Sequence, residues 1–215
     1  MKQEQYYRFV ALLSSEDKGS SVEYALQLLH EENVSLLELY QDFLARSLNE
    51  YVCPIEDKEA CIWREHARTA IVRTIVEATY PYVLTEKSKK VKLNQTVLVV
   101  CPSEEYHEVG ALIVANFFEL AGFNARYIGA NTPKKDILSA VKVLKPDYLA
   151  LSVTNYYNVV QTKQITDDLK SLFPEVKIIL GGAAFAHPSS LSVVQYDYHL
   201  TSYDSIEALA KEVTQ

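Results

Sequence analysis

The sequence predicts an α-helical bundle followed by an α/β domain built on a parallel sheet. Residues 1–88 carry apolar positions three and four apart, the period of amphipathic helices, and contain almost no glycine. Residues 89–215 instead alternate short β-branched runs with helical segments. The polar, charged stretch of residues 85–95 lies around the change of pattern, and we expect the linker there. The predicted domains are therefore 1–88 and 89–215.

Helical periodicity divides the first half into four segments, which predicts a four-helix bundle. The segments are residues 5–14, 21–32, 35–52 and 59–84. Ser35 precedes Glu38 by three residues, a capping-box spacing that would begin the third helix. Pro54 interrupts the pattern and permits a turn into the fourth helix, because proline is disfavoured in helix interiors.

Five short apolar runs in the second half are expected to be strands. They are residues 96–100, 124–130, 147–153, 177–182 and 198–202. Helical segments follow them, and these are residues 107–122, 133–144, 158–173, a short piece near Ser189, and 205–213. Strands that alternate with helices form right-handed βαβ units around a sheet covered on both faces. We therefore expect a Rossmann- or flavodoxin-like domain with a five-stranded parallel sheet.

Composition and charge narrow the function classes. The 215 residues are 48% hydrophobic and 23% charged, as in an ordinary soluble globular protein. The net charge of −7, with neither half basic, argues against direct nucleic-acid binding. No apolar run approaches the roughly 20 residues of a membrane span, so we expect a cytoplasmic protein with no membrane partner. Cys53, Cys61 and Cys101 lack a C-x-x-C spacing, and we expect reduced thiols.

Three polar or glycine-rich signals fall at predicted strand ends. His107 follows the first strand, Ser152 ends the third, and Gly181-Gly182 ends the fourth. Ligands of parallel α/β sheets bind at the carboxyl ends of the strands, so these residues are candidates for one site. The stretch EEYHEVG is not G-x-G-x-x-G, and its carboxylates would repel a pyrophosphate. A dinucleotide is therefore a poor candidate ligand.

The spacing of these signals resembles the motif of cobalamin-binding domains. Glu105-x-His107-x-x-Gly110, then Ser152-x-Thr154, then Gly181-Gly182 is similar to the family pattern D-x-H-x-x-G, S-x-L and G-G. A helical cap precedes this domain in methionine synthase and in corrinoid methyl-carrier proteins, so the resemblance covers both halves of the chain. It implies that cobalamin binds with its lower base displaced, with His107 as the metal ligand.

The resemblance also implies a role for each motif residue. Glu105 would accept the second ring N–H of His107 and so fix its tautomer, and Ser152 would extend that relay. Gly110 would leave room for the displaced nucleotide tail. Gly181 and Gly182 would let the backbone approach that tail closely.

At two positions the sequence departs from the common pattern, and there it resembles the B12-dependent photoreceptor regulators. Glutamate replaces aspartate at Glu105, and Thr154 replaces the leucine of S-x-L. The segment Y-x-G-A-N-T-P, which contains Gly129 and Thr132, also resembles that family. Those regulators usually carry an N-terminal DNA-binding domain, whereas this chain starts at the bundle, and we expect a relative without it.

The helical half of those regulators carries W-x9-E-H around the upper ligand of the cofactor. Glu65-His66 match the E-H pair, but Ile55 stands in place of the tryptophan, and Glu56 follows it. Trp63 lies one helical turn before His66 and would supply aromatic cover from another position, or else fill the core. Glu65 and His66 have an alternative reading as a polar pair between helices.

The first functional expectation is a cobalamin-binding sensor that is not an enzyme. It would favour adenosylcobalamin over methylcobalamin, respond to light, form a homo-oligomer and act on a transcriptional regulator. The alternative is a corrinoid protein that carries methyl groups between methyltransferases. A third reading is a storage domain that binds cobalamin without switching.

Overall fold

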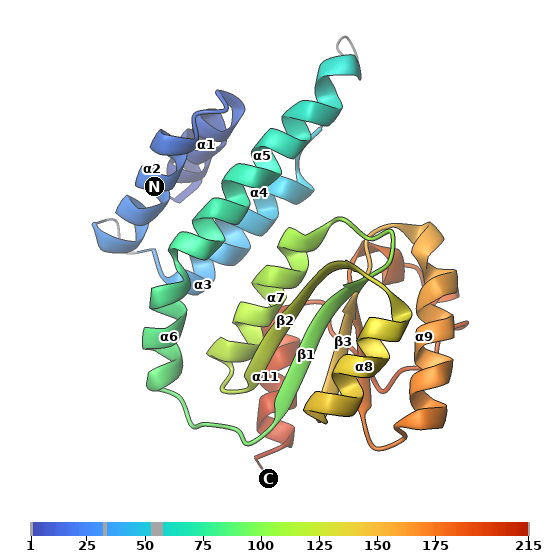
Figure 1. The fold of residues 1–215 in the computed structure, drawn as a ribbon. Coiled ribbons are helices and arrows are strands. Elements are labelled where there is room, and N and C mark those ends of the chain that lie inside the picture. The colour runs from blue at the N-terminus through green and yellow to red at the C-terminus, as the bar shows by residue number, and fades with distance from the viewer. Residues whose placement is uncertain (1, 32–33, 53–57, 215) are drawn as a thin grey trace. The chain divides into compact units, whose positions relative to one another are not determined.

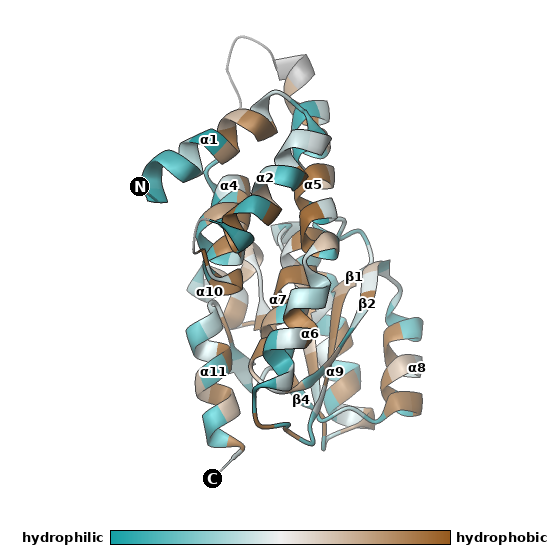
Figure 2. Ribbon diagram, turned by 90° about the vertical axis from the view of Figure 1, so that its left-hand side faces the viewer, coloured by the Kyte–Doolittle hydropathy of each residue, from teal (hydrophilic) through white to brown (hydrophobic). Residues whose placement is uncertain are grey.

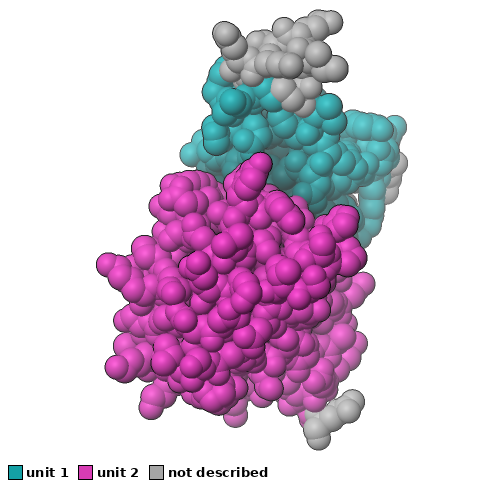
Figure 3. Space-filling model, turned by 90° about the vertical axis from the view of Figure 1, so that its right-hand side faces the viewer, with its two compact units in different colours: residues 1–83 teal, residues 84–215 magenta. Residues whose placement is uncertain are grey.

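The computed structural model describes residues 2–31, 34–52 and 58–214 (Figure 1). The chain forms two compact units, residues 1–83 and residues 84–215, which are coloured separately in Figure 3. The sequence pattern places this division at residue 88.

Unit 1 is helical, as its periodicity predicts. Its elements are α1 (Lys2–Ser14), α2 (Lys18–His30), α3 (Leu36–Glu38), the π-helical segment η1 (Leu39–Ala45), α4 (Arg46–Asn49), α5 (Lys58–Ala78) and the start of α6 (Tyr80–Ser88). The capping box at Ser35 is confirmed, because Ser35 Oγ accepts from Glu38 N at 3.2 Å and Glu38 Oε2 accepts from Ser35 N at 2.9 Å. The fully buried side chains of Phe9, Leu28 and Phe43 contribute to the core of this unit.

The predicted fourth helix, residues 59–84, is two helices. α5 ends at Ala78, and α6 begins at Tyr80. Pro81 explains the interruption, because it has no N–H to donate to the preceding turn and its ring clashes with a continuing helix. α6 extends to Ser88, so the first residues of the predicted linker are helical.

Unit 2 contains a five-stranded parallel sheet with strand order β2-β1-β3-β4-β5 (Figure 1). The strands are β1 (Thr96–Pro102), β2 (Asn124–Thr132), β3 (Tyr148–Ser152), β4 (Lys177–Gly181) and β5 (Tyr198–His199). The fold class predicted from the sequence is confirmed. The chain moves outward in one direction from β1 to β2 and in the other from β3 onward, so the topological switch point lies between β1 and β3.

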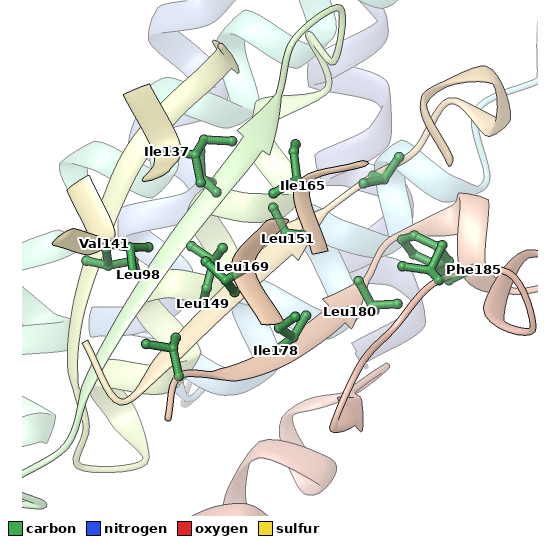
Figure 4. Packing of buried hydrophobic residues seen from close by; sticks show 14 of the residues in the cluster. Leu98, Ile137, Val141, Leu149, Leu151, Ile165, Leu169, Ile178, Leu180 and Phe185 are labelled. Atoms are coloured by element: carbon green, nitrogen blue, oxygen red, sulfur yellow. The ribbon is translucent and has the colours of Figure 1, made fainter. Parts of the chain in front are cut away.

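Helices cover both faces of the sheet. They are α7 (Glu108–Leu120), α8 (Lys134–Leu144), α9 (Val159–Leu172) and α11 (Tyr203–Glu212), with the short helices η2 (Tyr156–Asn158), η3 (Ala183–Phe185) and α10 (Pro188–Leu191) between them. Alternate strand residues such as Leu98, Leu149 and Ile178 pack with Ile137 of α8 and Leu169 of α9 (Figure 4). Both hydrophilic and hydrophobic segments occur along α8, α9 and α11 in Figure 2, as expected of helices with one buried face.

The cysteine expectation is only partly met. Cys101 is buried and free, but Cys61 is disulfide-bonded, so the prediction of reduced thiols is wrong for Cys61. A disulfide depends on how closely two cysteines approach in space, which sequence spacing does not reveal. Among the described helices, none combines the length and the apolarity needed to cross a membrane.

Candidate functional site

The loops that follow β1 and β3 meet at the switch point of the sheet. Glu105 and His107 lie on the loop between β1 and α7, and Thr154 to Asn158 follow β3. Hydrogen bonds of Glu105 join the two loops. The structure therefore brings together two parts of the predicted motif that are about fifty residues apart in the sequence.

Glu105 is the centre of this contact. Its side chain has no exposed surface, and both of its oxygens accept hydrogen bonds. Oε1 accepts from the backbone N of His107 at 3.2 Å and from His107 Nδ1 at 2.6 Å. Oε2 accepts from Thr154 N at 2.9 Å, Asn155 N at 2.8 Å and Asn158 Nδ2 at 3.2 Å. Five donors thus surround one carboxylate.

The donors keep Glu105 ionised despite its burial. Burial raises the pKa of the carboxyl group, because the charged form loses hydration. Hydrogen bonds from Asn155, His107, Thr154 and Asn158 favour the charged form, and the pKa lies below its ordinary value of 4.5. The group is therefore a carboxylate at neutral pH.

His107 presents the opposite side of its ring to solvent. An ionised carboxylate has no proton to donate, so His107 Nδ1 is the donor, and in the neutral imidazole Nε2 carries the lone pair. The His107 side chain is 57% exposed. Across the part of the chain that the structure describes, no hydrogen bond to Nε2 is present. His107 is thus an oriented imidazole with an available ligand nitrogen.

Asparagine side chains brace the loop from β1. Asn131 Oδ1 accepts from Glu104 N at 2.9 Å, and Asn131 N donates to Glu105 O at 3.0 Å. Asn158 Nδ2 also donates to Glu104 O at 3.2 Å, and Asn158 is buried. Glu104 has φ +60°, a conformation that these bonds hold in place. Sequence reasoning missed Asn131, Asn155 and Asn158, although Asn155 follows β3 at a position typical of loops closed by amide hydrogen bonds.

A narrow pocket opens on the face of the sheet that α7 and α11 cover. It has a volume of about 120 Å³. Ser152, Gly181 and Gly182 line it, and the hydroxyl residues Thr201 and Ser202 after β5 were not predicted. Its remaining walls are apolar side chains, including Val99, Ala150, Ile179, Phe117 and Ile206. Ser152 therefore lies in the pocket wall, and the relay partners of Glu105 come from Thr154, Asn155 and Asn158 instead.

The glycine pair at the end of β4 leaves little space for side chains. Gly182 has φ +97°, and a Cβ there would lie 2.3 Å from the carbonyl oxygen of Val153. A Cβ on Gly181 would lie 3.2 Å from the carbonyl oxygen of Leu200. Gly110, in the first turn of α7, differs because a Cβ there would meet no atom within 4 Å.

Gly129 and Thr132 lie near the carboxyl end of β2, where the pairing with β1 is irregular. Gly129 has φ +138°, and Thr132 Oγ1 donates to its carbonyl oxygen at 3.3 Å. These two residues therefore form a local turn contact at the same edge of the sheet as His107.

The residues predicted to face the upper ligand belong to α5 in unit 1. Trp63 is 49% exposed, so it is not core filler. Glu65 Oε1 accepts from Thr69 Oγ1 at 3.2 Å within the same helix, and His66 Nδ1 lies 3.8 Å from Glu65 Oε2. Both of these contacts lie within α5, so among the described residues the structure shows no hydrogen bond or ion pair from Glu65 or His66 to another helix. Ile55 and Glu56 lie outside the described residues.

The curated proteins that share sequence with this chain include a corrinoid protein and a transcriptional repressor. Trimethylamine corrinoid protein 2 of Methanosarcina acetivorans is 30% identical over 110 residues, which are 50% of this chain and 50% of that protein. The HTH-type transcriptional repressor CarA of Myxococcus xanthus is 24% identical over 119 residues, which are 55% of this chain and 40% of CarA. The chain thus spans about half the length of the curated relatives it matches, or less.

Among solved structures, the monomethylamine corrinoid protein of Methanosarcina barkeri matches with a TM-score of 0.79. The match covers 99% of this chain and 100% of that one at 16% identity, so the likeness concerns the fold.

A model of the B12 binding domain matches residues 95–204, the segment that contains Glu105, His107 and the glycine pair. The predicted resemblance is confirmed: the chain belongs to the B12 binding domain family, and its cofactor is a corrinoid.

Proposed function

We propose that this protein carries methyl groups between methyltransferases on a bound corrinoid, with His107 as the lower ligand of cobalt. The observation that carries the proposal is the 30% identity with trimethylamine corrinoid protein 2, together with an imidazole of fixed orientation at the expected position. A bound corrinoid supplies a cobalt centre that takes up and releases methyl groups.

The residues of unit 2 fit this cofactor. Cobalt accepts an imidazole nitrogen, and Nε2 of His107 is the available one. Glu105 holds the other ring nitrogen and raises the basicity of the ligand through its negative charge. The apolar pocket beside Ser152, with hydroxyl groups at its edge, would hold the nucleotide tail, and Gly181 and Gly182 would let the backbone approach it.

The proposal also includes a role for three residues of unit 1 and a set of protein partners. Trp63, Glu65 and His66 would cover the upper side of the corrinoid. Separate methyltransferases would be the partners. A homo-oligomer remains part of the proposal.

A second candidate function is the cobalamin-dependent sensor expected first. The specific observation in its favour is the match to the repressor CarA, along with the Glu65-His66 pair. We rank it second because the identity to CarA is 24%, against 30% for the trimethylamine corrinoid protein.

The test separates the two functions with one preparation. The protein is loaded with hydroxocobalamin, reduced chemically and given iodomethane, and its absorption spectrum is followed. A second sample is loaded with adenosylcobalamin and run on size exclusion in the dark and after green light. The carrier should hold the methylated corrinoid through His107 and should keep one size in the dark and after green light.

Two histidine variants test whether His107 is the ligand of cobalt. His107→Ala should abolish the spectrum of a histidine-ligated corrinoid, whereas His30→Ala, at an exposed histidine of unit 1, should preserve it. A light-dependent change in size would reject the carrier in favour of the sensor.

A further inference from the structure

Unit 1 contains a pocket that the corrinoid function does not use. It lies between the end of α1, the residues just after α4, and the N-terminal half of α5, and its volume is about 420 Å³. Val10, Leu13 and Val52 form apolar walls. We call it the Arg68 pocket, after the side chain that distinguishes it.

Among the described residues, Arg68 is a buried cation that no carboxylate contacts. It is 5% exposed. Its Nη1 donates to Ser14 Oγ at 3.2 Å and its Nη2 to the carbonyl oxygen of Ser47 at 3.3 Å, both neutral acceptors. Its Nε is buried and has no hydrogen-bond partner among the described residues. The guanidinium carbon lies 5.0 Å from the centre of the Tyr51 ring, which gives only a cation–π contact.

Such an arrangement is costly unless an anion completes it. Removing a guanidinium from water loses hydration, which neutral acceptors only partly replace. Burial accordingly lowers the pKa of Arg68. An arginine fork offers paired donors that match a carboxylate, and Nε of Arg68 has no acceptor among the described residues. The pocket therefore favours an anionic occupant.

Arg64 lies one turn before Arg68 on the same face of α5 and also lines the pocket. Its Nε is 3.4 Å from Glu16 Oε1, and both side chains are partly exposed. Ion pairs of this kind contribute little to stability, so an incoming carboxylate can compete with Glu16 for Arg64. Two guanidinium groups are thus within one site.

The walls and the rim indicate which anion fits. Glu16 and Glu50 both line the pocket, and Glu50 already accepts from Arg46 Nε at 2.8 Å and from Tyr6 OH at 2.9 Å. These two carboxylates would repel a multiply charged phosphate. The apolar walls suit a hydrocarbon body. We propose that the Arg68 pocket binds a small organic monocarboxylate, whose carboxylate pairs with Arg68 and Arg64 and whose apolar part contacts Val10, Leu13 and Val52.

The experiment is a titration of the full-length protein with sodium benzoate at constant ionic strength. It is followed by calorimetry and by the NMR signals of arginine Nε–H groups. Benzoate should bind saturably with one site per chain and shift the Arg68 Nε–H signal. Inorganic phosphate should bind at least tenfold more weakly. The proposal is independent of the corrinoid function, because the titration needs no cofactor.

Matched variants test the residues. Arg68→Gln and Arg64→Gln should each weaken benzoate binding about tenfold or more, as expected for loss of a charge-assisted hydrogen bond. Arg8→Gln removes the same charge from an exposed position on α1 and should leave binding unchanged. Should Arg68→Gln fail to fold, Arg64→Gln carries the test, because Arg64 is 43% exposed. Absent saturation in the wild type, equal loss in Arg8→Gln, or phosphate binding as tight as benzoate would overturn the proposal.

Discussion

His107 Nδ1 lies 2.6 Å from Glu105 Oε1, so an exposed imidazole is joined to a fully buried carboxylate. The other oxygen of Glu105 accepts from the loop after β3. The loops after β1 and β3 together hold Glu105, and Glu105 in turn fixes the orientation of the His107 ring. This connection makes the ring nitrogen Nε2 a predetermined ligand position, which lowers the cost of binding a metal.

Glu105→Gln should weaken corrinoid binding by roughly 10- to 100-fold, the range seen when the hydrogen-bonded partner of a metal-bound histidine is removed. An amide places a neutral group beside Nδ1 and cannot accept at both of its ends. Spectroscopic titration with hydroxocobalamin measures the change. Glu104→Gln is the matched control, because the described hydrogen bonds of Glu104 use its backbone. Equal affinity of wild type and Glu105→Gln would contradict the assigned role.

The same carboxylate predicts a pH dependence of stability. The pKa of Glu105 is lower in the folded protein than its ordinary value of 4.5, because hydrogen bonds to the charged form outweigh burial. Its contribution to the unfolding free energy is then fully present above about pH 4.5 and is lost as the pH falls through the folded pKa. The stability advantage of wild type over Glu105→Gln should shrink below pH 4.5. Urea unfolding of both proteins from pH 7 downward measures it, and a constant difference would count against the depressed pKa.

Much of the fold was predictable because buried parallel strands are continuous apolar runs. The runs beginning at Thr96 and Lys177 became β1 and β4 with the same first residue. The break between α5 and α6 was not foreseen, because apolar periodicity continues through Pro81 although the backbone cannot.

The site residues that belong to the sequence motif were predictable, whereas the residues that contact them from distant parts of the chain were not. Glu105 and His107 are two residues apart, so their contact follows from local geometry once the motif is recognised. Asn158 reaches Glu105 across 53 positions, a contact that depends on how the loops after β1 and β3 meet. The burial of Arg68 is equally invisible in sequence, because an arginine on an amphipathic helix is normally exposed.

The two kinds of glycine in the motif should respond in opposite ways to alanine. Gly182→Ala should lower the unfolding free energy by at least about 2 kcal/mol, because φ is +97° and the new Cβ would collide with the Val153 carbonyl group. Gly110→Ala should raise it by up to about 1 kcal/mol, since the Cβ meets open space in a helix. Chemical denaturation measures both values. A stable Gly182→Ala protein would show that the turn after β4 rearranges freely.

Filling the pocket beside β3 should discriminate between intact and truncated corrinoids. Ser152 lines a space of about 120 Å³, and leucine at this position would occupy part of it. If the pocket holds the nucleotide tail, Ser152→Leu should weaken cobalamin binding about tenfold or more, roughly 1.4 kcal/mol. Cobinamide lacks that tail and should bind wild type and variant alike through His107. Because cobinamide needs the same fold and the same histidine, it serves as the internal control for misfolding. Equal loss for both corrinoids would mean that the substitution disturbs the Glu105–His107 contact, whereas no loss for either would place the tail outside this pocket.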